Sequence, residues 1–199
     1  VLIEILSTLC KVLLVPVILV LLVFLGWTAI LFGGFLRECL MRPATRRALD
    51  GCLAAAKRGE QPARLWEMLG AACSGVSVAF YERTGSDTND RAILMHAIAE
   101  LEHVITYALA RLSLLTRVGP MLGLMGTLIP LGPVLTGLAA GDTQVMAQNL
   151  VVAFTTTVIG VLIGALAYAI SLVRRTWYAR DLCDLEFICQ RLVREGDRP

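Results

Sequence analysis

Charged residues are scarce in this 199-residue chain: Asp, Glu, Lys and Arg make up 17% of it, whereas 57% of its residues are hydrophobic. A soluble domain of this length could not bury so much apolar surface, so the composition argues against a soluble fold and favours one covered by lipid. The formal net charge of +2 is too small to indicate a nucleic-acid-binding protein.

Paired cysteine motifs are also lacking. The six cysteines contain no C-x-x-C pair, and five of them fall in segments that we expect on the cytoplasmic side. We therefore expect reduced thiols without a redox or structural role. They are Cys10, Cys39, Cys52, Cys73, Cys183 and Cys189.

Three long runs contain no Asp, Glu, Lys, Arg or His: residues 12–36, 118–141 and 143–173. Each run exceeds the roughly 20 residues that a helix needs to span a bilayer. Asp142 alone separates the second run from the third, where a short turn would join two antiparallel helices. The sequence therefore predicts an all-α integral membrane protein with three transmembrane helices, the last two forming a hairpin.

Most basic residues near the runs flank them on one side, with none at the Asp142 turn, and cytoplasmic segments near membrane spans are enriched in Lys and Arg. This rule predicts a multi-pass membrane protein with its N-terminus and the Asp142 turn outside and its C-terminus in the cytoplasm. The first run is longer than a signal-peptide core and no small-residue cleavage site follows it, so we expect a retained helix. The flanking residues are Arg37, Arg42, Arg46, Arg47, Lys57, Arg58, Arg64, Arg111, Arg117, Arg174, Arg175 and Arg180.

The expected organisation has four parts. Residues 1–36 form the N-terminal segment with the first span, and residues 37–112 form a cytoplasmic helical region. Residues 113–173 form the membrane hairpin, and residues 174–199 form a cytoplasmic C-terminal helix.

Within the region 37–112, apolar residues recur at three- and four-residue spacing, which predicts helices. One helix is expected over 44–58, after Pro43 and ending near Gly59, and a second from Pro62 through Phe80. A turn is expected over 85–89, followed by a third helix that continues without interruption into the second span. The third span is likewise expected to continue beyond residue 173 to about residue 193.

Small and polar residues gather inside the second and third runs. Pro120, Gly123 and Thr127 share one helical face of the second run, and Thr157, Gly160 and Gly164 share one of the third. Close helix packing explains such glycines in any membrane bundle, and a lone threonine hydroxyl commonly bonds to its own helix. Three consecutive threonines, 155–157, cannot all face one neighbour, because successive side chains are about 100° apart.

Two further features of these runs leave alternatives open. Asn149, near the expected outer end of the third span, either admits ions or caps the helix. Pro130 and Pro133 each remove a backbone hydrogen bond and loosen or kink the second span.

Two segments together resemble a known family. Gly119-Pro120-Met121-Leu122-Gly123-Leu124-Met125-Gly126-Thr127 resembles the second-helix signature of the TolQ and ExbB proteins, and Ala153-Phe154-Thr155-Thr156-Thr157-Val158-Ile159-Gly160 resembles their third-helix signature. With the three-span layout, the resemblance to the MotA/TolQ/ExbB proton channel family covers roughly residues 12–190. The layout is more similar to TolQ and ExbB than to MotA, which has an additional helix at the front.

The resemblance implies a homopentamer around two copies of a single-span ExbD/TolR/MotB-like partner whose membrane helix carries an Asp. Ion flow through that Asp would turn one ring relative to the other and deliver mechanical work. Thr127, Thr157 and Thr156 would lie on the ion pathway and meet the partner's Asp. Pro120 would lie at the cytoplasmic end of this lining, and Gly123, Gly160, Gly164 and Asn149 would line the pore or pack the helices.

The chain also departs from the family pattern. Val152 stands where TolQ and ExbB carry a Glu, and Pro130 stands where the family usually has Gly. We therefore expect a divergent branch in which another subunit supplies the titrating acid, since proton relay needs a titratable group near the midplane. Threonine oxygens also suit Na⁺, so H⁺ and Na⁺ both stay open.

A structural or adaptor membrane protein without an ion pathway is the alternative function. An enzyme is not expected, and neither is a cofactor or metal. The notable titratable cluster is His96, Glu100, Glu102 and His103. Glu100 and His103 have the spacing of a metal-binding pair in helix bundles, but no second Glu-x-x-His exists, so a solvated helix face is expected.

Overall fold

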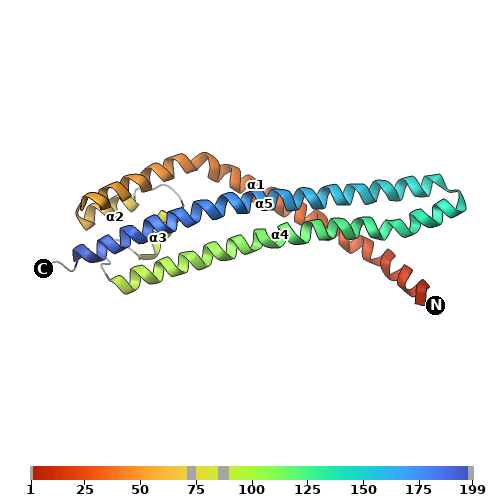
Figure 1. Cartoon of the computed structure of the whole chain (residues 1–199), viewed down its shortest axis with the longest axis horizontal. Coiled ribbons are helices and arrows are strands. Elements are labelled where there is room, and N and C mark those ends of the chain that lie inside the picture. The colour runs from red at the N-terminus through yellow and green to blue at the C-terminus, as the bar shows by residue number, and fades with distance from the viewer. Residues whose placement is uncertain (1, 71–74, 85–89, 197–199) are drawn as a thin grey trace. The chain divides into compact units, whose positions relative to one another are not determined.

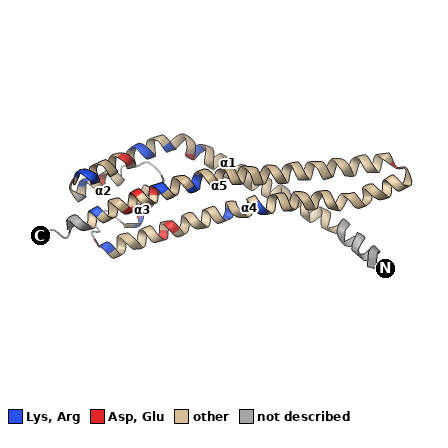
Figure 2. Cartoon of the chain, viewed as in Figure 1, with Lys and Arg blue, Asp and Glu red and all other residues tan. Residues whose placement is uncertain are grey.

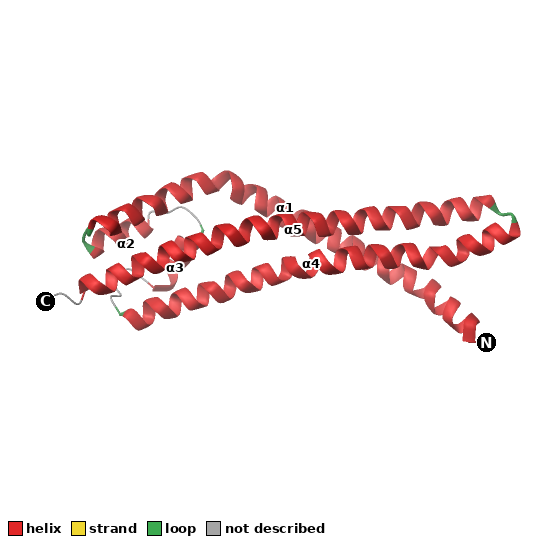
Figure 3. Ribbon diagram, viewed as in Figure 1, coloured by secondary structure: helices red, strands yellow, loops and turns green. Residues whose placement is uncertain are grey.

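The computed structural model describes residues 2–70, 75–84 and 90–196, and the side chains of residues 12–61, 63–70, 75–84 and 90–193. The described chain is helical, without a strand (Figures 1 and 3). The helices are α1 (Leu2–Arg58), α2 (Pro62–Gly70), α3 (Val76–Thr84), α4 (Arg91–Ala140) and α5 (Thr143–Gly196).

Three of these helices are long and apolar enough to cross a membrane: Val12–Arg58, Arg91–Ala140 and Thr143–Val193. They contain the three uncharged runs, so the all-α fold class with three membrane-length helices is confirmed. The expected continuity is confirmed too, because α4 runs unbroken from Arg91 to Ala140 and α5 from Thr143 to Gly196.

Glycines in the left-handed region end two of the long helices. Gly59 follows α1 with φ of 75°, and Gly141 follows α4 with φ of 74°. This conformation favours glycine because a Cβ would be strained there. The Asp142 carboxylate then caps α5 by accepting hydrogen bonds from the backbone N–H groups of Gln144 and Val145, both at 3.1 Å. The predicted helix end near Gly59 and the predicted turn at Asp142 are therefore confirmed.

Two predicted helix boundaries are wrong. Residues 44–58 do not form a separate helix, because α1 continues through Pro43. Pro43 has no N–H to donate to the carbonyl one turn earlier in the helix. Because Pro43 is exposed, water can reach this carbonyl, and the helix tolerates the proline. The helix predicted from Pro62 through Phe80 is divided into α2 and α3, and Gly75, with φ of 96°, immediately precedes α3. The turn predicted over 85–89 lies outside the described residues.

The chain forms two compact units. The hairpin unit comprises Val1–Gly33 and Arg111–Ser171, and the charged unit comprises Gly34–Ala110 and Leu172–Pro199. Beyond Arg117 the hairpin carries one charged residue, Asp142, whereas Lys, Arg, Asp and Glu are spread along the helices of the charged unit (Figure 2).

Each unit buries a different kind of core. In the charged unit, all five helices contribute apolar side chains to one cluster, in which Trp66 of α2 stacks on Phe80 of α3 with ring centroids 6.2 Å apart. In the hairpin unit, large apolar side chains stay exposed along the helices, among them Leu128, Phe154 and Val158. Exposed apolar surface of this extent needs lipid or protein to cover it.

Candidate functional site

Small residues form a seam between α4 and α5 in the hairpin unit. A Cβ placed on Gly160 would lie 2.7 Å from both the Gly119 carbonyl oxygen and the Gly123 Cα. A Cβ on Gly123 would in turn lie 3.2 Å from the Gly160 Cα. The two backbones therefore touch at a distance that admits no side chain, as in other small-residue contacts between membrane helices. Gly123 and Gly160 therefore pack against each other within the single chain, and a role in lining a pore stays a prediction.

Gly164 and Pro120 meet at one end of this seam. A Cβ on Gly164 would lie 2.6 Å from Pro120 Cγ and 3.3 Å from the Thr116 carbonyl oxygen. Pro120 has no N–H to donate to that carbonyl, and its ring needs room beside the helix. Gly164 leaves that room on α5, so the proline is accommodated inside α4.

Thr156 lies in the seam itself. Its side chain is buried, with the residue 5% exposed, and its hydroxyl donates to the Val152 and Ala153 carbonyls at 3.0 and 2.9 Å. A Cβ on Gly126 would lie 2.5 Å from Thr156 Oγ1. Within one chain, Thr156 therefore packs against α4 and its hydroxyl bonds to its own helix.

Thr127 and Thr157 lie on the same side of the hairpin, next to the seam. Each follows a seam residue, Gly126 or Thr156, by one position, which turns its side chain about 100° around the helix. Because α4 and α5 run in opposite directions, the same rotation along the chain leads both side chains to one side of the pair. Both residues are half-buried, so this side holds two hydroxyls that a neighbouring molecule could reach.

The hydroxyls on this side have local hydrogen bonds. Thr127 donates to the Leu124 carbonyl at 2.6 Å. Thr157 Oγ1 lies 3.3 Å from the Ala153 carbonyl and 3.5 Å from the Gly123 carbonyl of α4. Each hydroxyl oxygen also has lone pairs that can accept a further hydrogen bond.

The remaining polar residues of α5 point elsewhere. Thr155 is exposed, about 160° around the helix from Thr157, and donates to the Val151 carbonyl at 2.7 Å. Asn149 is half-buried, and its side-chain amide donates to the Val145 carbonyl at 2.8 Å, one turn earlier in the helix. This bond satisfies part of the Asn149 amide and leaves its carbonyl oxygen available.

Pro130 and Pro133 lie in the half of α4 nearer the turn. Pro130 is buried and Pro133 is half-buried, and both stay within a continuous helix. They cannot donate to the carbonyls of Gly126 and Ile129, so two helical hydrogen bonds are missing within one turn.

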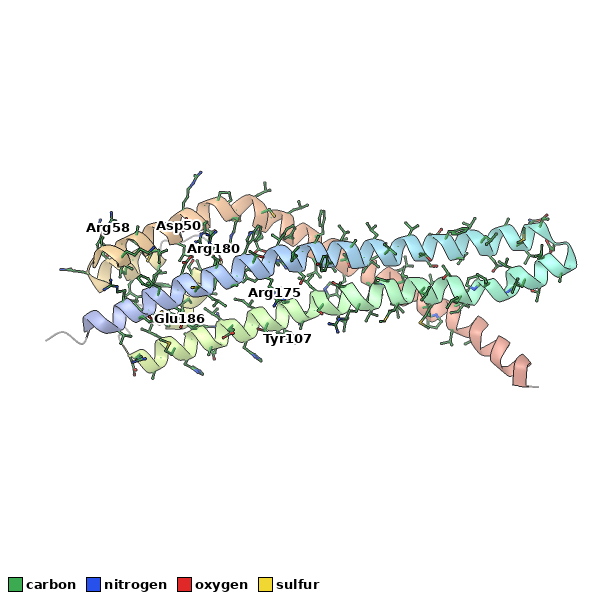
Figure 4. The ribbon with its side chains drawn as sticks, in the orientation of Figure 1. Asp50, Arg58, Tyr107, Arg175, Arg180 and Glu186 are labelled. Atoms are coloured by element: carbon green, nitrogen blue, oxygen red, sulfur yellow. The ribbon has the colours of Figure 1, made fainter. Side chains whose placement is uncertain are left out.

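The charged unit contains an ion-pair network that the sequence reasoning missed. Asp181 of α5 is buried, with its side chain 5% exposed, and it pairs with Arg42 at 2.7 Å and Arg46 at 2.9 Å. Arg46 also pairs with Asp184 at 2.7 Å and with Asp50, labelled in Figure 4, at 3.1 Å. Burial lowers the pKa of Arg46, but the hydrogen bond and charge of Asp184 and the other carboxylates raise it by more.

A second set of contacts joins α1 to α5 nearby. Glu38 accepts hydrogen bonds from Arg174 and from the Tyr178 hydroxyl, both at 2.8 Å. Burial, together with the charge of Glu38, raises the pKa of Tyr178 above its ordinary value. These partners are more than 130 residues apart in the chain, so no local spacing in the sequence indicates that they meet.

The histidine cluster is open to solvent. His96 Nε2 lies 3.6 Å from Glu100, and Arg83 lies at the same distance from that carboxylate. Among the described residues, no group of three or more His, Cys, Asp or Glu side chains is placed to hold a metal ion.

Comparison with protein families gives one match. The model of the MotA/TolQ/ExbB proton channel family matches residues 54–182, about two thirds of the chain. The searches of curated proteins and of solved structures found no match. The matched segment contains both signature segments and the whole seam of α4 and α5. The chain therefore belongs to the MotA/TolQ/ExbB proton channel family.

Proposed function

We propose that this chain is the channel subunit of an ion-driven rotary motor of the TolQ/ExbB type. Five copies surround two copies of a single-span partner whose membrane helix carries an Asp, and ion flow through that Asp is converted to mechanical work. Family membership supports channel or stator-like function in general. The observation that carries the finer proposal is the pair of hydroxyls, Thr127 and Thr157, on one side of a tightly packed hairpin.

The hairpin's chemistry supports an acid supplied by another subunit. Between residues 118 and 173 the only charged residue is Asp142, at the turn, and Val152 provides no carboxylate. A proton crossing the membrane needs a titratable group near the midplane. Thr127 and Thr157 would then hydrogen-bond to the partner's Asp and hold it in position, while Thr156, buried in the seam, keeps α4 and α5 at a fixed distance.

We further propose that the N-terminus and the Asp142 turn are outside the inner membrane and that the charged unit is in the cytoplasm. The asymmetry of Lys and Arg supports this orientation, since the basic residues flanking the spans, apart from Lys11, lie on one side. An impermeant thiol reagent applied to intact cells should label a cysteine introduced at Thr143 and leave Cys183 unlabelled. Labelling of Cys183 without labelling at position 143 would reverse the orientation.

A structural membrane protein without an ion pathway is the second candidate. It is favoured by the hydrogen bonds that each threonine hydroxyl makes to its own helix, since these satisfy the hydroxyls without any ion. Under this alternative the α4–α5 seam serves packing alone.

Ion flux separates the two candidates. The chain is purified from native membranes together with its bound single-span protein, and the complex is reconstituted into liposomes under an H⁺ or Na⁺ gradient. We expect flux that is lost when the partner's membrane Asp is changed to Asn. A complex that assembles but conducts neither ion would contradict the motor function and favour the structural one.

A further inference from the structure

A groove runs along the charged unit between α1 and α4, with a volume of about 500 Å³. One wall is a single face of α1, from Gly34 to Thr45, and the opposite wall is the α4 face that contains Val104, Ile105 and Ala108. Gly75, three residues of α3 (Val76, Ala79 and Arg83) and Tyr178 of α5 complete the lining. The volume lies within the range of about 300–1,000 Å³ that is typical of small-molecule sites.

One end of the groove lies at the end of the first uncharged run. Gly34 belongs to the run 12–36, and Arg37 is the first charged residue after it. If α1 crosses the membrane over this run, the groove opens at the membrane surface. Exposed apolar side chains lie nearby, with Leu40 82% exposed and Val104 51% exposed, as expected for surface that contacts lipid.

The charged residues that line the groove differ in whether they already have an ion-pair partner. Arg42 is held by Asp181, and the charge of Glu38 is balanced by Arg174. Arg37, in contrast, has no ion-pair or hydrogen-bond partner within the described residues. Arg83 pairs with Glu100 at 3.6 Å and donates a hydrogen bond to the Ala79 carbonyl at 3.0 Å.

We propose that this groove binds one anionic phospholipid from the leaflet around the end of the first span. Arg37 binds the headgroup phosphate, because a guanidinium forms paired hydrogen bonds with phosphate oxygens. One acyl chain lies against the apolar wall of Val104, Ile105 and Ala108. Basic pockets at the cytoplasmic side of membrane helices are suited to such lipids.

The lining of the groove favours a lipid as its occupant. The α4 wall of Val104, Ile105 and Ala108 is apolar and suits an acyl chain, and Arg37, next to the end of the first uncharged run, suits a phosphate.

Native mass spectrometry of the purified protein, incubated with equal amounts of phosphatidylglycerol and phosphatidylcholine, tests the proposal. We expect phosphatidylglycerol to be retained about tenfold more strongly, and Arg37→Gln to remove most of this preference. Arg175→Gln is the matched control, because Arg175, labelled in Figure 4, is exposed just after the third uncharged run and does not line the groove. It should retain phosphatidylglycerol like the unchanged protein.

A second variant tests the apolar wall without changing charge. Ala108→Trp fills the end of the groove nearest the membrane and should lower retention of phosphatidylglycerol at least about tenfold while circular dichroism stays unchanged. Soluble glycerol 3-phosphate in millimolar excess should not displace the lipid, because it lacks the acyl chain. Equal retention in Arg37→Gln and the unchanged protein, equal retention of the two lipids, or displacement by glycerol 3-phosphate would each overturn the proposal.

The proposal depends on the membrane placement of α1 and not on the ion pathway. Loss of lipid preference in Arg37→Gln with normal ion flux would support the lipid site independently of the motor function. A change in oligomeric state in Arg37→Gln, with lipid retention unaltered, would identify the groove as a contact between copies and overturn it.

Discussion

The hairpin unit and the charged unit hold their helices together by different means. In the hairpin unit, glycines let the backbones of α4 and α5 touch, and the large apolar side chains point outward. In the charged unit, large apolar side chains fill a core, and buried ion pairs such as Asp181 with Arg42 join α1 to α5. The difference follows from the surroundings that each unit needs. Helices in lipid have no hydrophobic driving force for association, so close contact between their backbones must hold them together. Water, in contrast, drives apolar side chains into a core.

The largest effect is expected from the ion pairs of the charged unit. Asp181→Ala leaves two partly buried guanidinium groups, Arg42 and Arg46, without this carboxylate. Breaking a buried pair costs about 3–5 kcal/mol, and we expect about 3 kcal/mol because both arginines keep some exposure. Denaturant unfolding followed by the fluorescence of Trp66, which stacks on Phe80, measures the loss.

Asp50→Ala is the control for this prediction. Its pair with Arg46 is on one helix, and the Asp50 side chain is 55% exposed, so the loss should stay below about 0.5 kcal/mol. Equal losses from the two substitutions would mean that burial does not distinguish the network from surface pairs.

The two buried cysteines of the charged unit, Cys52 and Cys189, test whether water reaches its core. Burial raises the pKa of Cys52 to about 11 and that of Cys189 to about 12. A thiol with a pKa of 11 is only about 0.1% thiolate at pH 8, so iodoacetamide should alkylate Cys52 at least about a hundredfold more slowly than exposed Cys183. Peptide mass mapping over time gives both rates, and comparable rates would mean that water reaches the core.

The same pKa values set a pH dependence of folding. The folded-state pKa of each thiol lies above the unfolded value of about 8.5. The contribution of the thiols to stability is therefore complete below about pH 8 and is lost as the pH rises through about 11 and 12. Cys52→Ala should therefore reduce the loss of stability at alkaline pH.

In the hairpin unit the corresponding test is Gly160→Ala. The new Cβ would meet the Gly119 oxygen and the Gly123 Cα at 2.7 Å, and these backbone atoms cannot rotate aside. The helices must separate, at an expected cost of about 1–3 kcal/mol. Helicity measured during titration with sodium dodecyl sulfate reports the change.

Gly26→Ala serves as the control within the hairpin unit. Nothing lies within 4 Å of a Cβ at Gly26, so the same chemical change should be neutral or stabilising by up to about 1 kcal/mol. If the two alanine variants were equally stable, the seam would not depend on backbone contact.

The smallest effect on stability is expected from the helix caps, which both units contain. Asp142 caps α5 in the hairpin, and Asp90 caps α4 in the charged unit by accepting from the Ala92 N–H at 2.8 Å. Asp→Ala at either position should cost about 1 kcal/mol, and Asp→Asn should cost only a few tenths because Asn is as good a cap. A much larger loss at one cap, measured by thermal unfolding, would reveal a contact beyond capping.

The sequence predicted the long helices well because their signals are local. Gaps between charges located the three apolar helices, and Gly59 and Asp142 marked helix ends through their own backbone chemistry. Pro43 misled the prediction because an exposed proline can stay inside a long helix. The division between α2 and α3 was missed because the apolar periodicity of residues 62–80 continues across it.

The site was predictable only where neighbours in sequence define it. The glycine spacing indicated a packed seam, and Gly123 and Gly160 lie in it. The sequence analysis gave Thr156 the same role as Thr157, although Thr156 is buried against α4. The sequence alone does not show which face of a helix packs against its neighbour. The contact of Arg42 with Asp181 joins residues 139 positions apart and depends on the tertiary fold.

The most direct test of the proposed motor is ion flux through complexes that carry Thr→Val substitutions in α4 and α5. Valine keeps the branched shape and removes the hydroxyl, and a hydrogen bond to a charged group contributes about 1.5–3 kcal/mol. Thr127→Val and Thr157→Val should therefore slow flux about ten- to a hundredfold, whereas Thr→Ser at either position should be mild. Thr155→Val, on the opposite side of α5, should leave flux near normal. Unchanged flux in both Thr127→Val and Thr157→Val, with assembly intact by size, would contradict the account.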